Sequence, residues 1–164
     1  MLEPETDTAF IVQDINGKPV EGAIVEPYHV RVGSYDIPPD TLRELAGGIT
    51  DAAGRVALPA LGRERLLRVE IRKAGFGRQQ MRLKDSASSP ACRTIQLRPT
   101  GALEVQIFGA TPSQLKDYKY YVHQLFDDAY TSGVAEGTLT ADGRVIVSEI
   151  AEGEIKLVLG TNND

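Results

Sequence analysis

Hydrophobic residues recur at every second position along three stretches of the chain, residues 67–71, 103–107 and 155–159. In the first stretch the apolar residues are Leu67, Val69 and Ile71, and their polar neighbours are Arg68, Glu70 and Arg72. A period of two places successive side chains on opposite faces of an extended strand. One face then packs in a core and the other faces water, as antiparallel sheets permit. The pattern therefore predicts β-strands, with residues 68, 70 and 72 in solvent.

Turn-forming dipeptides separate the strand-like stretches. They are Asn16-Gly17, Ala53-Gly54 and Asp142-Gly143. Glycine takes the positive φ that tight hairpins require, so each dipeptide predicts a hairpin. Asp51 and Asp142 are accordingly interpreted as turn formers.

Two short segments have the composition of helices, residues 39–46 and 111–118. In the second, Thr111 suits the N-cap and Pro112 suits the first helical position. Gln114 stands where a capping-box partner is expected. The sequence predicts two small helices in the loops of a β fold.

An eight-residue motif occurs twice. Gly54–Leu61 recurs as Gly143–Ile150, a spacing of 89 residues (143 minus 54). Together with the strand alternation, the repeat predicts an all-β fold of antiparallel Greek-key β-sandwich modules, two in tandem, with one or two short helices in loops. The predicted modules are residues 1–99 and a shorter related one at 100–164. Because the second copy is shorter, the strand at 154–159 is expected at or near a sheet edge.

Composition limits the possible classes of function. Hydrophobic residues make up 41% and charged residues 25% of the 164, with a formal net charge of -5. The acidic balance argues against a nucleic-acid partner, and the basic stretch 63–82 alternates as a solvated strand face does. No apolar run reaches the length of about 20 residues needed to insert directly into a membrane. The lone Cys92 excludes an intramolecular disulfide and is interpreted as a buried thiol.

Residues that carry enzymatic chemistry are sparse. The two histidines, His29 and His123, have no metal-ligand spacing, and no Gly-x-Ser-x-Gly motif occurs. The sequence therefore predicts no catalytic residue, no metal site and no cofactor. An enzyme would require one histidine to lie in a cleft beside a nucleophile or a carboxylate.

Aromatic residues are concentrated between positions 118 and 130. They are Tyr118, Tyr120, Tyr121, Phe126 and Tyr130. Exposed tyrosines form flat faces that stack on sugars or contact a protein partner, which makes the four tyrosines candidate ligand-binding residues. Alternatively, tyrosine and phenylalanine are good strand residues that pack in the core or across strands. Both interpretations stay open.

Three motifs in the first half resemble the carboxypeptidase regulatory-like domains, which are transthyretin-like (prealbumin-like) β-sandwiches. Residues 16–25 are similar to the opening Gly-turn and Pro-Val-x-Gly-Ala-x-Val segment of that family, and residues 50–58 to its Thr-Asp-x-x-Gly-x-Phe-x-Leu segment. Gly75-Phe76 stands where the family has Gly-Tyr. Two departures are Val56 in place of the usual aromatic residue and a longer stretch at 28–48. That longer stretch is a reasonable place for specificity.

The resemblance implies a non-catalytic binding or spacer module of a larger envelope, periplasmic or extracellular protein, contacting another protein or a neighbouring domain. The alternative is a carbohydrate-binding, starch-binding-like module that uses the tyrosines on a polysaccharide. A small hydrolase is the third hypothesis. The first residues lack the pattern of a signal peptide, which fits either a native start or a segment of a longer protein.

Overall fold

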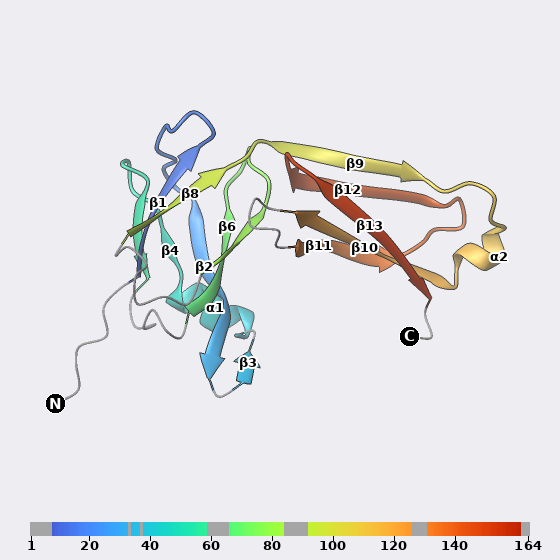
Figure 1. Cartoon of the computed structure of the whole chain (residues 1–164), viewed down its shortest axis with the longest axis horizontal. Coiled ribbons are helices and arrows are strands. Elements are labelled where there is room, and N and C mark those ends of the chain that lie inside the picture. The colour runs from blue at the N-terminus through green and yellow to red at the C-terminus, as the bar shows by residue number, and fades with distance from the viewer. Residues whose placement is uncertain are drawn as a thin grey trace. The chain divides into compact units, whose positions relative to one another are not determined.

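A computed structural model describes residues 8–32, 34–36, 38–58, 66–83, 92–125 and 131–161 of the chain (Figure 1). The chain divides into two compact units, Met1–Arg98 and Pro99–Asp164. Both are built mainly of strands, which confirms the predicted all-β sandwich class. No helix within the described ranges is long and apolar enough to cross a membrane.

The first unit is a sandwich of two sheets. One sheet has the order β5-β1-β8, comprising β5 (Arg55–Leu58), β1 (Thr8–Asp14) and β8 (Cys92–Leu97). The other has the order β3-β2-β6-β7, comprising β3 (Ser34–Asp36), β2 (Ile24–Val32), β6 (Leu66–Arg72) and β7 (Gln79–Arg82). β4 (Gly48–Ile49) also pairs with β2, and the helix α1 (Asp40–Ala46) contacts β2.

The core of the first unit lies between its two sheets. Phe10 and Val12 of β1 are fully buried, as are Val25 of β2 and Val69 and Ile71 of β6. These alternate positions confirm the predicted core face of residues 67–71. The prediction that Glu70 faces water is wrong, because its side chain is 1% exposed.

The second unit is a smaller sandwich. One sheet pairs β9 (Thr100–Gln106) with β12 (Arg144–Ala151). The other has the order β11-β10-β13, comprising β11 (Thr131–Thr138), β10 (Tyr118–Leu125) and β13 (Ile155–Thr161). Its core includes Val122, Val145, Val147 and Ile150. Among the described strands β13 lies at one edge of its sheet, which confirms the expected edge position.

One strand pair departs from the predicted antiparallel pattern. β1 and β8 are parallel, with partners running from Ala9 and Cys92 to Asp14 and Leu97. β7 and β8 lie in different sheets, so the chain crosses the sandwich and returns beside β1 in the same direction. Turn motifs do not reveal such a crossover, because they report only local reversals.

Cys92 is exposed, so the interpretation as a buried thiol is wrong. Burial alternates along β8, and Ile95 and Leu97 take the inward positions. Cys92 has the opposite parity and faces out.

The predicted turns form, but those at Gly54 and Gly143 do not join paired strands. Gly17, Gly54 and Gly143 all have positive φ, between 70° and 79°. The turn at Gly54 connects β4 to β5, and the turn at Gly143 connects β11 to β12; in both cases the two strands belong to different sheets. After Gly17 the chain runs back antiparallel to β1. The Asp14 amide donates to the Lys18 carbonyl at 2.9 Å, Gln13 and Pro19 form an isolated bridge, and the Val20 amide donates to the Val12 carbonyl at 2.9 Å. The hairpin prediction is therefore wrong for Gly54 and Gly143, whose turns pass the chain across the sandwich, whereas at Gly17 the chain does reverse beside β1.

Both predicted helices are present. α1 covers Asp40–Ala46, while α2 is shorter than predicted and covers Pro112–Leu115. At α2 the capping box is complete: the Gln114 amide donates to Thr111 Oγ1 at 3.4 Å, and the Thr111 amide donates to Gln114 Oε1 at 2.8 Å. α2 ends early because β10 begins at Tyr118.

The turn at Gly54 allows a paired test of glycine. Gly54 has φ of 71°, and a Cβ there would overlap the carbonyl oxygen of Val12. Gly75 has φ of 84° with no atom within 4 Å of such a Cβ. Gly75→Ala should cost about 1–2 kcal/mol of unfolding free energy from the left-handed backbone alone. Gly54→Ala should cost more than Gly75→Ala in urea unfolding, and equal costs would show that the Val12 contact does not matter.

Candidate functional site

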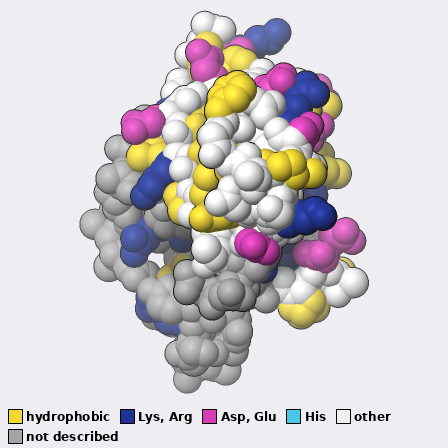
Figure 2. Space-filling view, turned by 90° about the vertical axis from the view of Figure 1, so that its right-hand side faces the viewer, with side chains coloured by type: hydrophobic (Ala, Val, Ile, Leu, Met, Phe, Trp, Pro, Cys, Tyr) yellow, Lys and Arg dark blue, Asp and Glu magenta, His cyan; other side chains and the backbone are white. Residues whose placement is uncertain are grey.

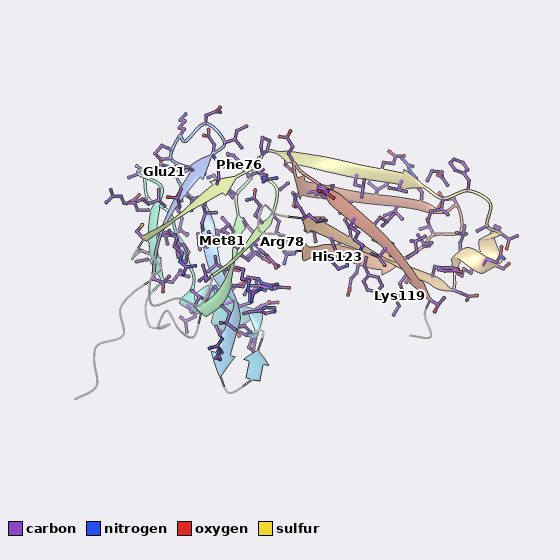
Figure 3. The ribbon with its side chains drawn as sticks, in the orientation of Figure 1. Glu21, Phe76, Arg78, Met81, Lys119 and His123 are labelled. Carbon is purple, nitrogen blue, oxygen red and sulfur yellow. The ribbon has the colours of Figure 1, made fainter. Side chains whose placement is uncertain are left out.

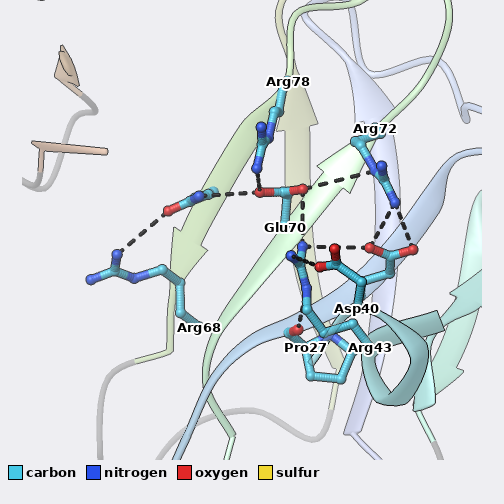
Figure 4. A network of polar contacts seen from close by, with 9 residues as sticks. Pro27, Asp40, Arg43, Arg68, Glu70, Arg72 and Arg78 are labelled. Atoms are coloured by element: carbon cyan, nitrogen blue, oxygen red, sulfur yellow. Dashed lines mark hydrogen bonds and ion pairs between the residues drawn. The ribbon is translucent and has the colours of Figure 1, made fainter. Parts of the chain in front are cut away.

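Two glutamates are buried on the outer face of the larger sheet in the first unit. Glu26 of β2 and Glu70 of β6 are partners in the antiparallel register, and their side chains are 6% and 1% exposed. Their neighbours Val25 and Ile71 fill the core, so the glutamates have the opposite parity and face outward. They are buried on that face by α1 and by arginines of the sheet (Figure 4).

Glu70 binds a guanidinium or amide group with each of its carboxylate oxygens. Arg43 Nη2 lies 3.1 Å from Oε1, and Arg78 Nη2 lies 2.5 Å from Oε2. Gln80 Nε2 donates to Oε2 at 3.2 Å, and Arg72 Nε lies 3.8 Å from Oε1. Four side chains, from α1, β6, β7 and the segment just before β7, therefore surround one carboxylate.

Arg43 joins α1 to both glutamates. Besides Glu70, it lies 3.5 Å from Glu26 Oε2 and donates from Nε to the carbonyl oxygen of Pro27 at 3.2 Å. Its Nη1 donates to Asp40 Oδ1 at 3.3 Å, within the helix. Glu26 in turn accepts from Arg72 Nη2, at 2.7 Å from both of its oxygens. We call Glu26, Arg43, Glu70, Arg72 and Arg78 the ion network.

The ion network has the properties of a structural element. A buried charge is tolerated only when it is paired and hydrogen-bonded, and each glutamate here has at least two arginine partners. Arg72 and Arg78 are 48% and 43% exposed, so the network also reaches the surface. The ion network thus fixes the positions of its guanidinium groups and of α1.

Tyr28 and His29 extend this polar face along β2. Arg43 Cζ lies 5.1 Å and Arg68 Cζ 6.0 Å from the Tyr28 ring centroid, both within cation–π range. The His29 and Tyr28 rings are 4.9 Å apart. Burial lowers the pKa of His29 below its ordinary value, and the charge of Arg68 lowers the pKa further.

Four large apolar side chains are exposed near the ion network. Leu42 and Leu45 of α1 are 54% and 82% exposed, and Ile24 of β2 and Ile49 of β4 are 38% and 68% exposed. Ile24 and Ile49 are register partners, and Ile24 shares the outer face of Glu26. Leu42 and Leu45 are three residues apart and lie on one side of the helix. We call these four residues the apolar platform.

The platform inverts the usual arrangement of a surface helix. α1 buries Arg43 against the sheet and exposes Leu42 and Leu45. An amphipathic surface helix ordinarily faces the core with its apolar stripe. The sequence signal that could have revealed the platform is Arg43, which stands between two leucines in the longer stretch 28–48. The sequence does not show that Arg43 is buried, because its partners lie on distant strands.

The structure distributes the candidate tyrosines over two faces of β10. Tyr118 and Tyr120 share the parity of the buried Val122, whereas Tyr121 has the opposite parity. Lys119 and His123 project from one side of the strand, as Figure 3 shows, and share the parity of Tyr121. Tyr118 is 37% exposed, and Tyr120 and Tyr121 are half-buried. Tyr130 and Phe126 lie outside the described residues.

Two of these tyrosines lie against glycines of neighbouring strands. A Cβ on Gly137 of β11 would lie 2.7 Å from the Tyr120 hydroxyl, so this ring covers the glycine. A Cβ on Gly160 of β13 would lie 3.5 Å from Tyr121 Cε2. An aromatic ring beside a strand glycine supplies the packing that the glycine lacks.

The remaining chemistry-bearing residues are dispersed. His29 belongs to the first unit and His123 to the second. Among the described residues no group of three or more His, Cys, Asp or Glu side chains is placed to hold a metal ion. A shallow hollow of about 500 Å³ lies along the outer face of β1, lined by residues that include Ile11, Ala57 and Cys92. On the face seen in Figure 2, acidic, basic and apolar side chains are intermingled.

The structural likeness of this chain to a known protein is weak. No family model matches the chain, and no curated protein sequence matches it. A streptococcal ancillary pilin is similar in structure at a TM-score of 0.38 and 16% sequence identity. The likeness covers 94% of this chain and 53% of the pilin chain, so this chain spans about half of that protein. The resemblance to carboxypeptidase regulatory-like domains stays a prediction.

Removal of Arg43 tests the ion network. Arg43→Leu leaves two buried glutamates with fewer cations, and we expect it to lower the unfolding free energy by about 3 kcal/mol. Urea unfolding measures the loss, and hydrogen exchange should show faster exchange of the α1 amides. Arg82→Leu, at an exposed position of β7, is the control and should change stability by less than about 0.5 kcal/mol. Similar losses for the two variants would contradict a stabilising network.

His29 should make stability depend on pH. Because its pKa is lowered on folding, the folded state binds a proton more weakly than the unfolded chain does. The stability is therefore complete above the ordinary pKa of 6.5 and falls as the pH drops below it. Between about pH 7.5 and about pH 5.5, urea unfolding should show a smaller loss for His29→Gln than for the wild type. His123→Gln, in the other unit, is the control, and an unchanged loss in His29→Gln would refute the prediction.

Proposed function

We propose that the chain is a non-catalytic protein-contact module of a larger envelope or extracellular protein, and that it makes its contact through the apolar platform. The exposure of Leu42 and Leu45 on α1 carries this proposal. Four of the nine exposed large hydrophobic side chains among the described residues belong to the platform. They form two exposed apolar pairs, Leu42 with Leu45 on one side of α1 and Ile24 with its register partner Ile49, and exposed apolar surface of this kind is typical of interaction sites.

The surroundings of the platform support a protein partner. Arg72 is the register partner of Ile24 and is 48% exposed. Interfaces typically combine an apolar centre with a polar rim and are enriched in arginine. Here Arg72 is also held by Glu26, so its guanidinium already has a fixed position.

The ion network gives the platform the rigidity that binding favours. A loop that orders only on binding loses conformational entropy and therefore affinity. Arg43 holds α1 on the sheet before any partner arrives, because it bonds to Glu70 and to the Pro27 carbonyl. The residues that expose Leu42 and Leu45 are thus ordered in the free protein.

Carbohydrate binding is the second candidate. The exposure of Tyr118 and the half-exposure of Tyr121 favour it, since tyrosine rings stack on sugars. Because these two side chains lie on opposite faces of β10, a flat sugar-binding site can include only one of them, together with neighbouring side chains on the same face. Retention on starch or glucan gels that Tyr121→Ala or Tyr118→Ala abolishes would favour this candidate over the platform.

A photo-crosslinking amino acid at position 45 tests the platform in the source cells. We expect one discrete protein adduct, identified by mass spectrometry, and no such adduct from a probe at the exposed Lys18. Adding Leu42→Ser to the probe-bearing protein should remove the adduct while changing the unfolding free energy by less than about 0.5 kcal/mol. The same adducts from positions 45 and 18, or an adduct that survives Leu42→Ser, would overturn the platform as the contact surface.

A further inference from the structure

The repeated sequence motif occupies the same place in both units. In the first unit the Val12 amide donates to the Gly54 carbonyl at 2.7 Å, and in the second the Ile107 amide donates to the Gly143 carbonyl at 3.0 Å. Phe10 pairs with Val56 as Val105 pairs with Val145. β9 with β12 therefore corresponds to β1 with β5, residue for residue.

The two units differ at the next strand position. In the first unit the other side of β1 is occupied by β8, in parallel. β6 is likewise flanked on its second side by β7. Within the described parts of the second unit, β9 pairs only with β12, and β13 pairs only with β10. The described residues of the second unit contain no strands that correspond to β7 and β8.

Burial shows what this difference leaves uncovered. Val56 and its counterpart Val145 are both buried, at 8% and 1% exposure. Phe10 is fully buried, whereas its counterpart Val105 is only partly buried. The core is thus well covered at both β5 and β12 but less well covered at β9 than at β1.

The same holds for the other sheet of the second unit. Val69 and Ile71 of β6 are fully buried, beneath a sheet that β7 extends. On β13, Leu157 is only partly buried and Leu159 is 41% exposed. Inward-facing apolar side chains on both edge strands are therefore open to solvent.

The backbone of β9 presents hydrogen-bonding groups at this open edge. The Ile107 amide is bonded across to Gly143, and in an antiparallel pair the bonded residues alternate. Ala102, Glu104 and Gln106 thus direct their N–H and C=O groups away from β12. An unpaired strand edge of this kind accepts a strand from another chain.

We propose that the free edge of β9 is a docking site for an extended strand of a partner protein, which runs parallel to β9 as β8 runs parallel to β1. Its apolar residues fall at every second position and cover Val105 and Ile107. In the first unit Ile95 covers Val12, the counterpart of Ile107, whereas Arg93 stands opposite Phe10, the counterpart of Val105. This surface belongs to the second unit, so the inference does not rest on the apolar platform.

Charge selects the flanking residues of that strand. The second unit contains ten acidic and only four basic residues, and Glu104 lies on β9 itself. β8, which occupies the corresponding place in the first unit, is followed by Arg98, which has the parity of the outward Cys92, whereas Arg93 has the parity of the inward Ile95. The partner strand is accordingly basic at its non-apolar positions, since complementary charge steers association.

A peptide with the sequence of residues 92–99, with serine in place of Cys92, is a suitable probe. Labelled with fluorescein, it should bind the full chain in an anisotropy titration and shift the amide resonances of β9 and β13. A control peptide carries aspartate in place of Ile95 and Leu97 and should not bind. Equal binding of the two peptides, or no binding of the first up to millimolar concentration, would overturn the proposal.

Two variants at one position separate the strand edge from the side chain. Glu104→Pro removes an N–H from the free edge but none from the β12 ladder, and should weaken peptide binding about tenfold or more. Glu104→Ala loses the same ion pair with Arg144 but keeps the N–H, and should weaken binding less than about threefold. Equal effects of the two variants, with both folded by circular dichroism, would contradict strand pairing. Sedimentation of the chain alone should show a monomer, and a dimer that Glu104→Pro dissolves would replace the partner protein with a second copy.

Discussion

The contact of Arg43 with Glu26 and Glu70 determines the arrangement of the outer face of the first unit. A guanidinium and two carboxylates removed from water are stable only together, because each uncompensated charge would cost several kcal/mol. Arg43 therefore binds α1 to the sheet at one defined position. Replacing all of these residues by apolar ones could preserve stability, yet it would remove the directional contacts that orient the helix. The exposed leucines of α1 owe their placement to this directionality.

The two units differ in whether further strands cover the edges of their sheets. In the first unit β7 and β8 continue the two sheets, and the core residues of β1 and β6 are fully buried. In the second unit β9 and β13 are the last described strands, and their inward side chains are only partly buried. The same turn and the same strand pair thus give a closed core in one unit and an open one in the other. Local sequence specifies the hairpin-like turn, whereas later strands decide whether the core is covered.

Much of the fold could be predicted from alternation and turn chemistry, because both are local. Val69 and Ile71 were correctly predicted as core, and Thr111 and Gln114 correctly predicted the start of α2. The burial of Glu70 was not predicted, because its partners Arg43 and Arg78 lie 27 and 8 residues away in the sequence. Alternation along one strand does not show which other segments pack against it. The parallel pairing of β8 and the passage of the Gly54 turn between sheets were missed for the same reason. The tyrosines were predicted as candidates from composition, but only strand parity separates Tyr120 from Tyr121.

Parity also explains why the two proposed contact surfaces are physically distinct. The apolar platform consists of side chains that point away from a core already complete, so a partner there adds a new interface without changing the unit. The residues at the edge of β9 point inward, so a partner there completes an existing core and adds backbone hydrogen bonds. The first kind of contact depends on side chains fixed by Arg43, and the second on main-chain groups that β12 leaves free. Binding at the platform should therefore respond to changes in the ion network, whereas binding at β9 should stabilise the second unit itself.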